Sequence, residues 1–240
     1  MIDVSVRSTQ RELMDDFNGS VDELRVILKD INRVNALLGG NRITVNAVFS
    51  LIAAHPKESY TIMDVGCADG NMLRALALEA RKRGVALRLV GVDLNAHALA
   101  IAKEASRAFP EISYLEQDVL HPEVGRMPCD LVLATLTMHH FPEDLISQFT
   151  QRFLDMARIG VVINDLHRNA LAYYLFHAFS LFFIKTRTAK IDGLRSIQRA
   201  FTRADLQQFA QALPQATHRI AWKWAFRYLW VFQHKTQKTQ

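Results

Sequence analysis

Residues 62–70 read IMDVGCADG, and this stretch decides the fold. A short apolar run reaches Asp64 and Gly66, and two small residues then lead to a second acid and a second glycine, Asp69 and Gly70. A glycine directly after a buried strand allows a tight turn or a close approach of the backbone to a ligand. The stretch therefore predicts a strand followed by a ligand-binding turn.

The segments after this stretch repeat a rhythm of strand and helix. Strands are predicted at 60–65, 87–92, 112–115, 130–136 and 160–164, and helices at 71–83, 96–109 and 143–157. Strands that alternate with helices of this length are typical of βαβ units, whose right-handed crossovers place helices on both faces of a parallel sheet. The sequence therefore predicts an α/β fold with a doubly wound, mostly parallel sheet.

Both ends of the chain depart from this rhythm. Residues 10–53 have apolar residues at helical spacing with a break at Gly39-Gly40, and 217–234 alternate enough to predict a terminal pair of strands. The predicted organisation is an N-terminal helical lid, a main domain and a helical cap inserted in that domain (1–57, 58–240 and 169–201).

Composition excludes several classes of protein. The chain has 240 residues, of which 50% are hydrophobic and 22% charged, so a largely disordered chain is not expected. The net charge is +5, but Lys and Arg are scattered, and the run Arg81-Lys82-Arg83 is explained by a helix end. A nucleic-acid partner is therefore not expected.

Cysteine usage and the first residues indicate the compartment. Cys67 and Cys129 lie in unrelated contexts, with neither a disulfide framework nor zinc-ligand spacing. The first residues lack the apolar segment of a secretory signal. A reducing, cytoplasmic environment is the expectation.

The turn at 66–70 also limits the ligand. A dinucleotide-binding turn needs a G-x-G-x-x-G pattern, but Ala68 stands at the middle glycine and Asp69 puts negative charge where a pyrophosphate would lie. NAD and ATP are therefore disfavoured. S-adenosylmethionine fits better, since it carries a sulfonium and an ammonium group and no phosphate.

Two further acids follow the next two predicted strands. Asp93 could accept hydrogen bonds from both ribose hydroxyls, and Asp118 from the exocyclic amine of adenine, with Val119 packed on the ring. Ligands of open parallel sheets bind at this edge, beyond the carboxyl ends of the strands. The alternative is that each acid only caps a helix or belongs to an ordinary polar loop.

Four stretches in this order resemble the successive motifs of class I S-adenosylmethionine-dependent methyltransferases. They are DVGCADGNML (64–73), GVDLN (91–95), LEQDVL (115–120) and CDLVLATLTMHHF (129–141). The resemblance covers about residues 58–166 and implies a Rossmann-like, seven-stranded sheet whose last strand is antiparallel. It also implies S-adenosyl-L-methionine as cofactor.

The resemblance assigns a part of the cofactor to each motif. The methionine moiety would be surrounded by Asp64, Gly66, Cys67, Asp69 and Gly70, the ribose bound by Asp93 and the adenine by Asp118. Leu94, Val119 and Thr135 complete the predicted cofactor-binding set. The family has a glycine where this chain has Ala68, and a methyl group there is a small intrusion. The thiol of Cys67 is expected to be a small packing group and not a nucleophile.

Catalytic residues are expected where the fourth and fifth strands end side by side. His139 or His140, oriented by Asp165, is predicted to deprotonate an acceptor hydroxyl, with His167 as a reserve candidate. One of the histidines could instead only cap the next helix. No metal is expected, because a single Asn164-Asp165 pair is poor support for one.

The acceptor is expected to be hydrophobic. The resemblance to a bacterial small-molecule subgroup implies an aromatic or polyketide- or quinone-like acceptor, methylated at a hydroxyl oxygen. The alternatives are methylation of a carbon in the same class, or a cofactor-binding protein without catalysis. The apolar run at 170–184 could cover the acceptor, pack against the N-terminal helices or a second copy of the chain, or contact a membrane surface.

Overall fold

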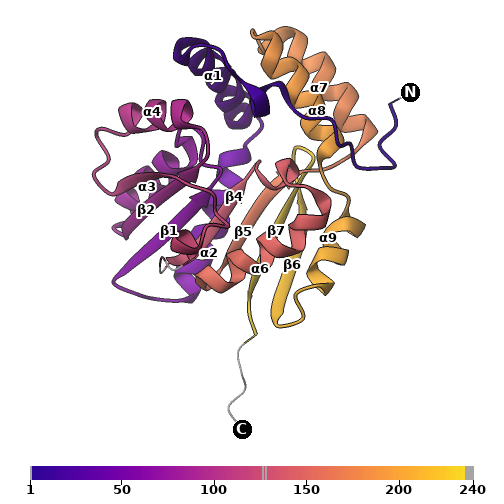
Figure 1. Cartoon of the computed structure of the whole chain (residues 1–240). Helices are drawn as coiled ribbons and strands as arrows, with labels where there is room; N and C mark the ends of the chain where they lie inside the picture. Colours follow the sequence, from indigo (N-terminus) through magenta and orange to yellow (C-terminus); the bar gives the residue numbers. More distant parts are fainter. Residues whose placement is uncertain (1, 126, 128, 236–240) are drawn as a thin grey trace.

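The chain folds around one seven-stranded sheet (Figure 1). The structure, a computed structural model, describes residues 2–125, 127 and 129–235. The strands are β1 (Ser59–Val65), β2 (Ala86–Asp93), β3 (Ile112–Glu116), β4 (Cys129–Thr135), β5 (Ala157–Leu166), β6 (Ala216–Lys223) and β7 (Arg227–His234). Their order is β3-β2-β1-β4-β5-β7-β6, and β7 runs opposite to the other six strands, so it pairs antiparallel with both β5 and β6. The predicted fold class is confirmed; residues 236–240 of the predicted main domain lie outside the described residues.

Helices cover both faces of the sheet, as the alternating pattern requires. One face packs against α2 (Gly40–Ala54) and α3 (Asn71–Arg83), and the other against α6 (Ile146–Met156) and α9 (Arg203–Gln211). Successive side chains of β1 alternate between the two layers, with Ile62 in one apolar cluster and Met63 in the other. The short α5 (Pro122–Gly125) and α4 (Ala96–Ala105) complete the crossovers.

The order of the strands reverses between β1 and β4, and this reversal positions the site. Asp64 of β1 lies beside Leu133 of β4, and Thr135 of β4 lies beside Asn164 of β5. The carboxyl ends of the three strands therefore share one edge. In open parallel sheets, ligands bind in the crevice outside such a switch point.

Helices from both irregular regions lie over this edge. They are η1 (Leu13–Asp16), α1 (Val21–Leu37), α7 (Ala170–Phe183) and α8 (Arg187–Arg199), with α1 and the α7–α8 pair side by side above the sheet in Figure 1. The segment after α7 is thus also a helix, α8, within the predicted cap at 169–201. The two helices of the predicted lid have different surroundings, since α1 contacts α4 and α8 whereas α2 packs on β5 and β7.

The described helices differ in length and in apolar content. No single one of them is long and apolar enough to cross a bilayer; α1 and α2 reach that length and composition only as a pair, which is bent by 67°.

Candidate functional site

A cavity of about 1700 Å³ opens at the carboxyl edge of β1, β2 and β4, beneath α1, α7 and α8. A pocket for one drug-sized ligand measures about 300–1,000 Å³, so this cavity has room for a cofactor and a second molecule. Its lining includes all the predicted cofactor-binding residues except Gly70, together with His139 and His140. Asp165 and His167 are not among the lining residues.

The turn after β1 is held by its own backbone and by β2. The amides of Gly66 and Cys67 donate to the carbonyl of Val92, at 2.8 and 3.2 Å. Gly66 has φ +68°, and a Cβ there would lie 2.3 Å from Cγ2 of Thr137, so only glycine fits. Ala68 has φ +45°, so its departure from the family pattern strains the backbone as well as adding a methyl group.

Asp69 does not offer the ligand a free negative charge. Its carboxylate pairs with Arg74 at 3.5 Å and accepts a hydrogen bond from Nδ2 of Asn32, in α1, at 2.7 Å. A second interaction, from the amide of Asn71 at 3.2 Å, occupies its other oxygen. Asp69 therefore stabilises the turn and ties it to α1.

The surroundings of Asp64 differ from those of Asp69. Its side chain is buried at the cavity, and burial, with a smaller contribution from the charge of Asp93, raises its pKa to about 8. A carboxyl group in this state gains most from a ligand that brings positive charge. The geometry suits the cationic end of S-adenosylmethionine.

Asp93 joins β2 to both neighbouring turns. Its Oδ2 accepts from the amide of Ala68 at 2.8 Å, and its Oδ1 accepts from the amide of Asn95 at 2.9 Å. The cap of α4 is Asn95, whose side chain accepts from the amide of Ala98 at 3.0 Å. Asp93 thus positions the cofactor turn, and its remaining lone pairs are free for a diol.

The other predicted cofactor residues surround the same part of the cavity. Asp118 is exposed and accepts from the amide of Leu120 at 2.8 Å, while Val119 is buried and Leu94 is 71% exposed. Thr135 meets Thr44 of α2, with 3.1 Å between the hydroxyl oxygens. Burial raises the pKa of the Cys67 thiol, so this residue packs and is not a nucleophile.

His139 and Asp165 form a buried pair. Asp165 accepts from Nδ1 of His139 at 2.7 Å and from its amide at 3.1 Å, and the His139 side chain is 2% exposed. Burial opposes the charged imidazole, but Asp165 and Glu12 outweigh it and raise the pKa of His139 to about 9. At neutral pH this histidine already carries the proton that a general base would have to accept.

His140 has a different partner and a different exposure. Its Nδ1 lies 2.8 Å from Asp15, not near Asp165, and its side chain is 32% exposed. Asp15 also pairs with Arg199 at 2.8 Å, and Arg199 donates to the carbonyls of both histidines. Burial of Asp15 would raise the pKa of its carboxyl group, but the hydrogen bonds with His140 and Arg199 outweigh it and lower that pKa.

His167 lies apart from this group. Its ring contacts Tyr228, with centroids 4.9 Å apart, and burial together with Arg168 lowers its pKa. The structure therefore pairs His139 with Asp165, pairs His140 with Asp15 instead, and leaves the reserve candidate His167 out of the residues that line the cavity.

Known proteins match this sequence and this architecture. Residues 62–160 match the family model described as a methyltransferase domain. A 2-phytyl-1,4-naphtoquinone methyltransferase from Thermosynechococcus vestitus is 38% identical over 63 residues, which are 26% of this chain and 27% of that protein. The match thus spans about a quarter of that relative's length.

Residues 62–160 belong to a class I methyltransferase domain, whose sheet continues to β7.

Solved structures of methyltransferases share the fold over most of the chain. A plantazolicin methyltransferase bound to a desmethylPZN analog and SAH has a TM-score of 0.67 at 14% identity, with 93% of each chain covered. A magnesium protoporphyrin IX methyltransferase from Synechocystis PCC 6803 with bound SAM has a TM-score of 0.56 at 14% identity, covering 91% of this chain and 87% of that one.

Part of the site lies outside residues 62–160, and no sequence pattern pointed to it. Glu12, Asp15 and Arg199 surround the two histidines of the turn after β4. Arg7 also supports this turn, since it donates to the carbonyls of His139 and Phe141 at 2.7 and 2.8 Å. The only local signal is the spacing of Glu12 and Asp15, three residues apart at the start of η1, which resembles an ordinary cap.

Proposed function

We propose that this chain is an S-adenosylmethionine-dependent methyltransferase that methylates a hydroxyl oxygen of a hydrophobic small molecule. One observation carries the proposal: a single cavity is lined by the acids at or just after the ends of β1, β2 and β3, by apolar side chains of α7, and by the two histidines after β4. A cationic cofactor suits the acids, and a hydrophobic acceptor suits the apolar part of the cavity.

The cofactor side has a charge pattern that distinguishes between cofactors. Because Asp69 pairs with Arg74, the acidic groups left for a ligand at the ends of β1 to β3 are Asp64, Asp93 and Asp118, of which Asp64 ionises when a cation binds beside it. This arrangement repels phosphates and attracts a sulfonium and an ammonium group. We assign Asp64 to the cationic methionine end, Asp93 to the ribose and Asp118 to the adenine.

The reaction is a direct displacement. The S–CH₃ bond of the cofactor breaks as a bond forms between that carbon and the acceptor oxygen, the electron pair stays on sulfur, and the hydroxyl proton leaves the acceptor. The protein supplies alignment of the two molecules and a group that receives the proton. Since His139 keeps its own proton near neutral pH, we assign that role to His140, oriented by Asp15, and to the neighbouring Glu12.

The acceptor class follows from the apolar half of the cavity. Leu175, Phe176 and Phe179 of α7 line it together with Ile184, and this lining suits an aromatic or polyketide- or quinone-like molecule. One relative is named for a naphthoquinone and one structural neighbour for a porphyrin, which supports a flat hydrophobic acceptor. A role in secondary metabolite biosynthesis and a cytoplasmic location fit this proposal.

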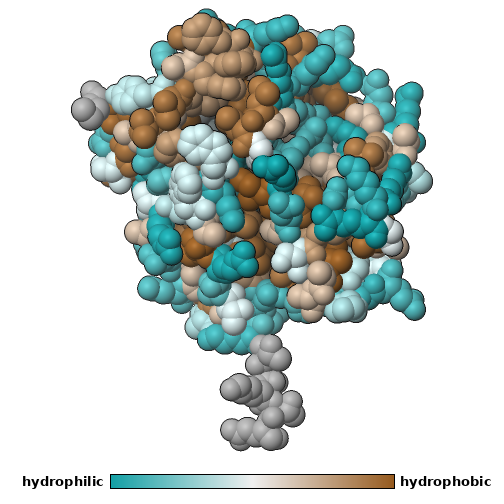
Figure 2. Space-filling view, turned by 180° about the vertical axis from the view of Figure 1, so that it is seen from behind, coloured by the Kyte–Doolittle hydropathy of each residue, from teal (hydrophilic) through white to brown (hydrophobic). Residues whose placement is uncertain are grey.

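The outer face of α7 is apolar and exposed, which indicates a further binding surface on this chain. Leu171, Leu181 and Phe182 are exposed, and Figure 2 shows apolar side chains gathered at the α7 end of the molecule. This face suits a second copy of the chain or the surface of a membrane that holds the acceptor.

Calorimetry on the purified protein tests the cofactor, with NADH and ATP as controls. We expect micromolar binding of S-adenosylmethionine and none of the controls; absence of binding would refute the proposal. Turnover is then measured as S-adenosylhomocysteine formed with a panel of hydroxylated naphthoquinones.

A paired acceptor separates the two chemistries. A naphthoquinone whose hydroxyl is already a methyl ether cannot be methylated at that oxygen, so loss of turnover supports O-methylation. Unchanged turnover indicates methylation of a carbon, and cofactor binding without turnover of any acceptor indicates a binding protein.

A further inference from the structure

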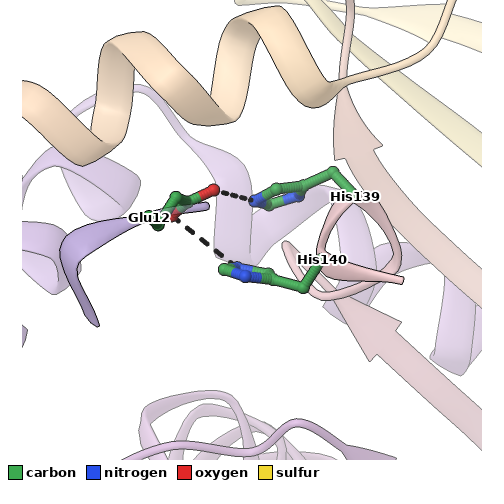
Figure 3. A group of neighbouring side chains, drawn as sticks. All are labelled: Glu12, His139 and His140. Carbon is green, nitrogen blue, oxygen red and sulfur yellow. Dashed lines mark ion pairs between the residues drawn. The ribbon is translucent and has the colours of Figure 1, made fainter. Parts of the chain in front are cut away.

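Three side chains from two distant parts of the chain converge at the acceptor side. Glu12 comes from the segment before η1, and His139 and His140 are consecutive in the short helix η2 (Met138–His140). Figure 3 shows both imidazole rings directed at the Glu12 carboxylate. One ligand atom from each of the three residues lies within 4.8 Å of the others.

Both histidines present the same nitrogen to Glu12. Nδ1 of His139 is held by Asp165 at 2.7 Å and Nδ1 of His140 by Asp15 at 2.8 Å. A carboxylate on Nδ1 fixes the ring and the tautomer, so the lone pair of a neutral imidazole is on Nε2. Histidines that bind metals in proteins almost always have such a second partner.

The Glu12 carboxylate has an oxygen that the protein does not satisfy. The residue is 6% exposed, and among the described residues Oε1 has no hydrogen-bond partner. Nε2 of His139 lies 3.4 Å from Oε1, and Nε2 of His140 lies 3.8 Å from Oε2. In the free protein the nearest positive charge to Oε1 is the imidazolium of His139, which is too far away for a close hydrogen bond. A metal ion that displaced this proton would bring a positive charge within bonding distance of the carboxylate.

These separations are close to those around a metal ion. With bonds of about 2.0–2.1 Å, two ligand atoms of a tetrahedral ion are about 3.3 Å apart. Two imidazoles and one carboxylate with open positions suit zinc or iron(II), whereas magnesium prefers oxygen ligands. We infer that Glu12, His139 and His140 bind a divalent transition-metal ion.

The location gives the ion access to the acceptor. All three residues line the cavity, so the remaining coordination positions face the space where the acceptor hydroxyl would lie. A bound cation lowers the pKa of an oxygen that coordinates it. With the ion bound, His140 and Glu12 are ligands and no longer receive the proton; the ion lowers the pKa of the acceptor hydroxyl, and the proton passes to solvent. This catalytic role rests on the proposed function, in which the acceptor loses a hydroxyl proton; the binding of the ion does not.

The test uses untagged protein stripped with a chelator and titrated with Co²⁺ and with Zn²⁺. We expect one ion per chain, with visible absorption bands for bound Co²⁺. Both cysteines are buried and do not compete. Glu12→Gln and His140→Gln should each weaken binding at least about a hundredfold, and Asp15→Asn, which loses only the partner of a ligand, about tenfold.

The matched control is His177→Gln, which changes an exposed histidine of α7 and should leave the affinity unchanged. Absence of binding, or equal binding in all variants, would overturn the inference and leave the three residues as an ion-paired cluster. Thermal melting of each variant confirms folding. S-adenosylmethionine binding on the same samples separates the two proposals, since metal binding without cofactor binding removes the proposed function and keeps the metal site.

Discussion

The two turns that form the floor of the cavity are built in different ways. The turn after β1 (66–70) is held mainly by amides and carboxylates of residues close to it or in the adjacent strand, with one further contact from Asn32 of α1. The turn after β4 (138–140) is held by Arg7, Asp165 and Arg199, from three separate parts of the chain. The cofactor side (the turn at 66–70) is thus held mainly by nearby residues, whereas the acceptor side (the turn at 138–140) is held by distant parts of the chain.

This difference determines how each side fails. Damage to the first turn should affect cofactor binding directly, because its backbone is the binding surface. Damage to the second should lower stability and turnover and leave cofactor binding intact, because its supports lie outside the cofactor turn. The variants below test that separation, in decreasing order of expected effect.

Gly66→Ala should be the most damaging change, because the new methyl group meets Thr137 at 2.3 Å. We expect a loss of about 3 kcal/mol or more in the free energy of unfolding and no measurable cofactor binding. Gly84→Ala is the matched control: it has φ +66° with nothing within 4 Å, so it should cost only about 1 kcal/mol. Equal costs in urea denaturation would contradict the steric account.

Arg199→Met should disturb the turn after β4 (138–140) and leave the cofactor turn unchanged. It removes the ion pair with Asp15 and leaves the carbonyl of His140 without that donor, which should lower the free energy of unfolding by about 3 kcal/mol. The dissociation constant for S-adenosylmethionine should stay within about twofold. A large loss of cofactor affinity in the folded variant would show that the two sides are coupled.

Asp93→Ala should raise the cofactor dissociation constant about a hundredfold. The change removes the proposed ribose ligand and also releases the amides of Ala68 and Asn95. Asp118→Ala, which removes an exposed carboxylate, should raise the constant about tenfold or less. An unchanged constant for Asp93→Ala, measured by calorimetry, would refute the ribose assignment.

Asp64→Asn should remove a pH dependence of about tenfold. The pKa of Asp64 is about 8 in the free protein, and a cationic ligand favours its ionised form, so wild-type affinity should rise with pH and level off above about 8. In the ratio of wild-type to variant dissociation constants, titration of the ligand itself cancels. A ratio that is flat between about pH 6 and 9 would remove Asp64 from the cationic site.

In the protein without ligand, the free energy of unfolding should change with pH in the opposite direction to the cofactor affinity. The pKa of Asp64 is higher in the folded than in the unfolded chain, so the folded state binds more protons at intermediate pH. Relative to Asp64→Asn, the free energy of unfolding should therefore fall as pH rises toward 8.

The sequence predicted the fold and the cofactor side because both depend on short patterns. Alternating strands and helices determine the sheet, and the class I methyltransferase assignment is confirmed by the family match. The proximity of His139 and Asp165 was also predictable, since β4 and β5 are neighbours and their ends share a register. The roles of these residues stay predictions.

The rest of the acceptor side depends on contacts that no local pattern encodes. The partner of His140 is Asp15, 125 positions away, and not Asp165. The helix α8 has a mostly polar sequence, and besides α7 it contacts α1, η1 and η2, which come from distant parts of the chain. Such pairings are decided by packing and not by spacing.

The position of Arg7, Glu12 and Asp15 before the first strand has a practical consequence for anyone who handles this protein. A chain shortened by its first 16 residues would keep all seven strands and the turn at 66–70, yet it would lack three of the side chains that support the acceptor side. Exchange of this short segment between related chains offers a way to change the acceptor while the cofactor stays the same. For the same reason, an affinity tag is better attached beyond β7, whose end lies at the opposite edge of the molecule from these residues (Figure 1).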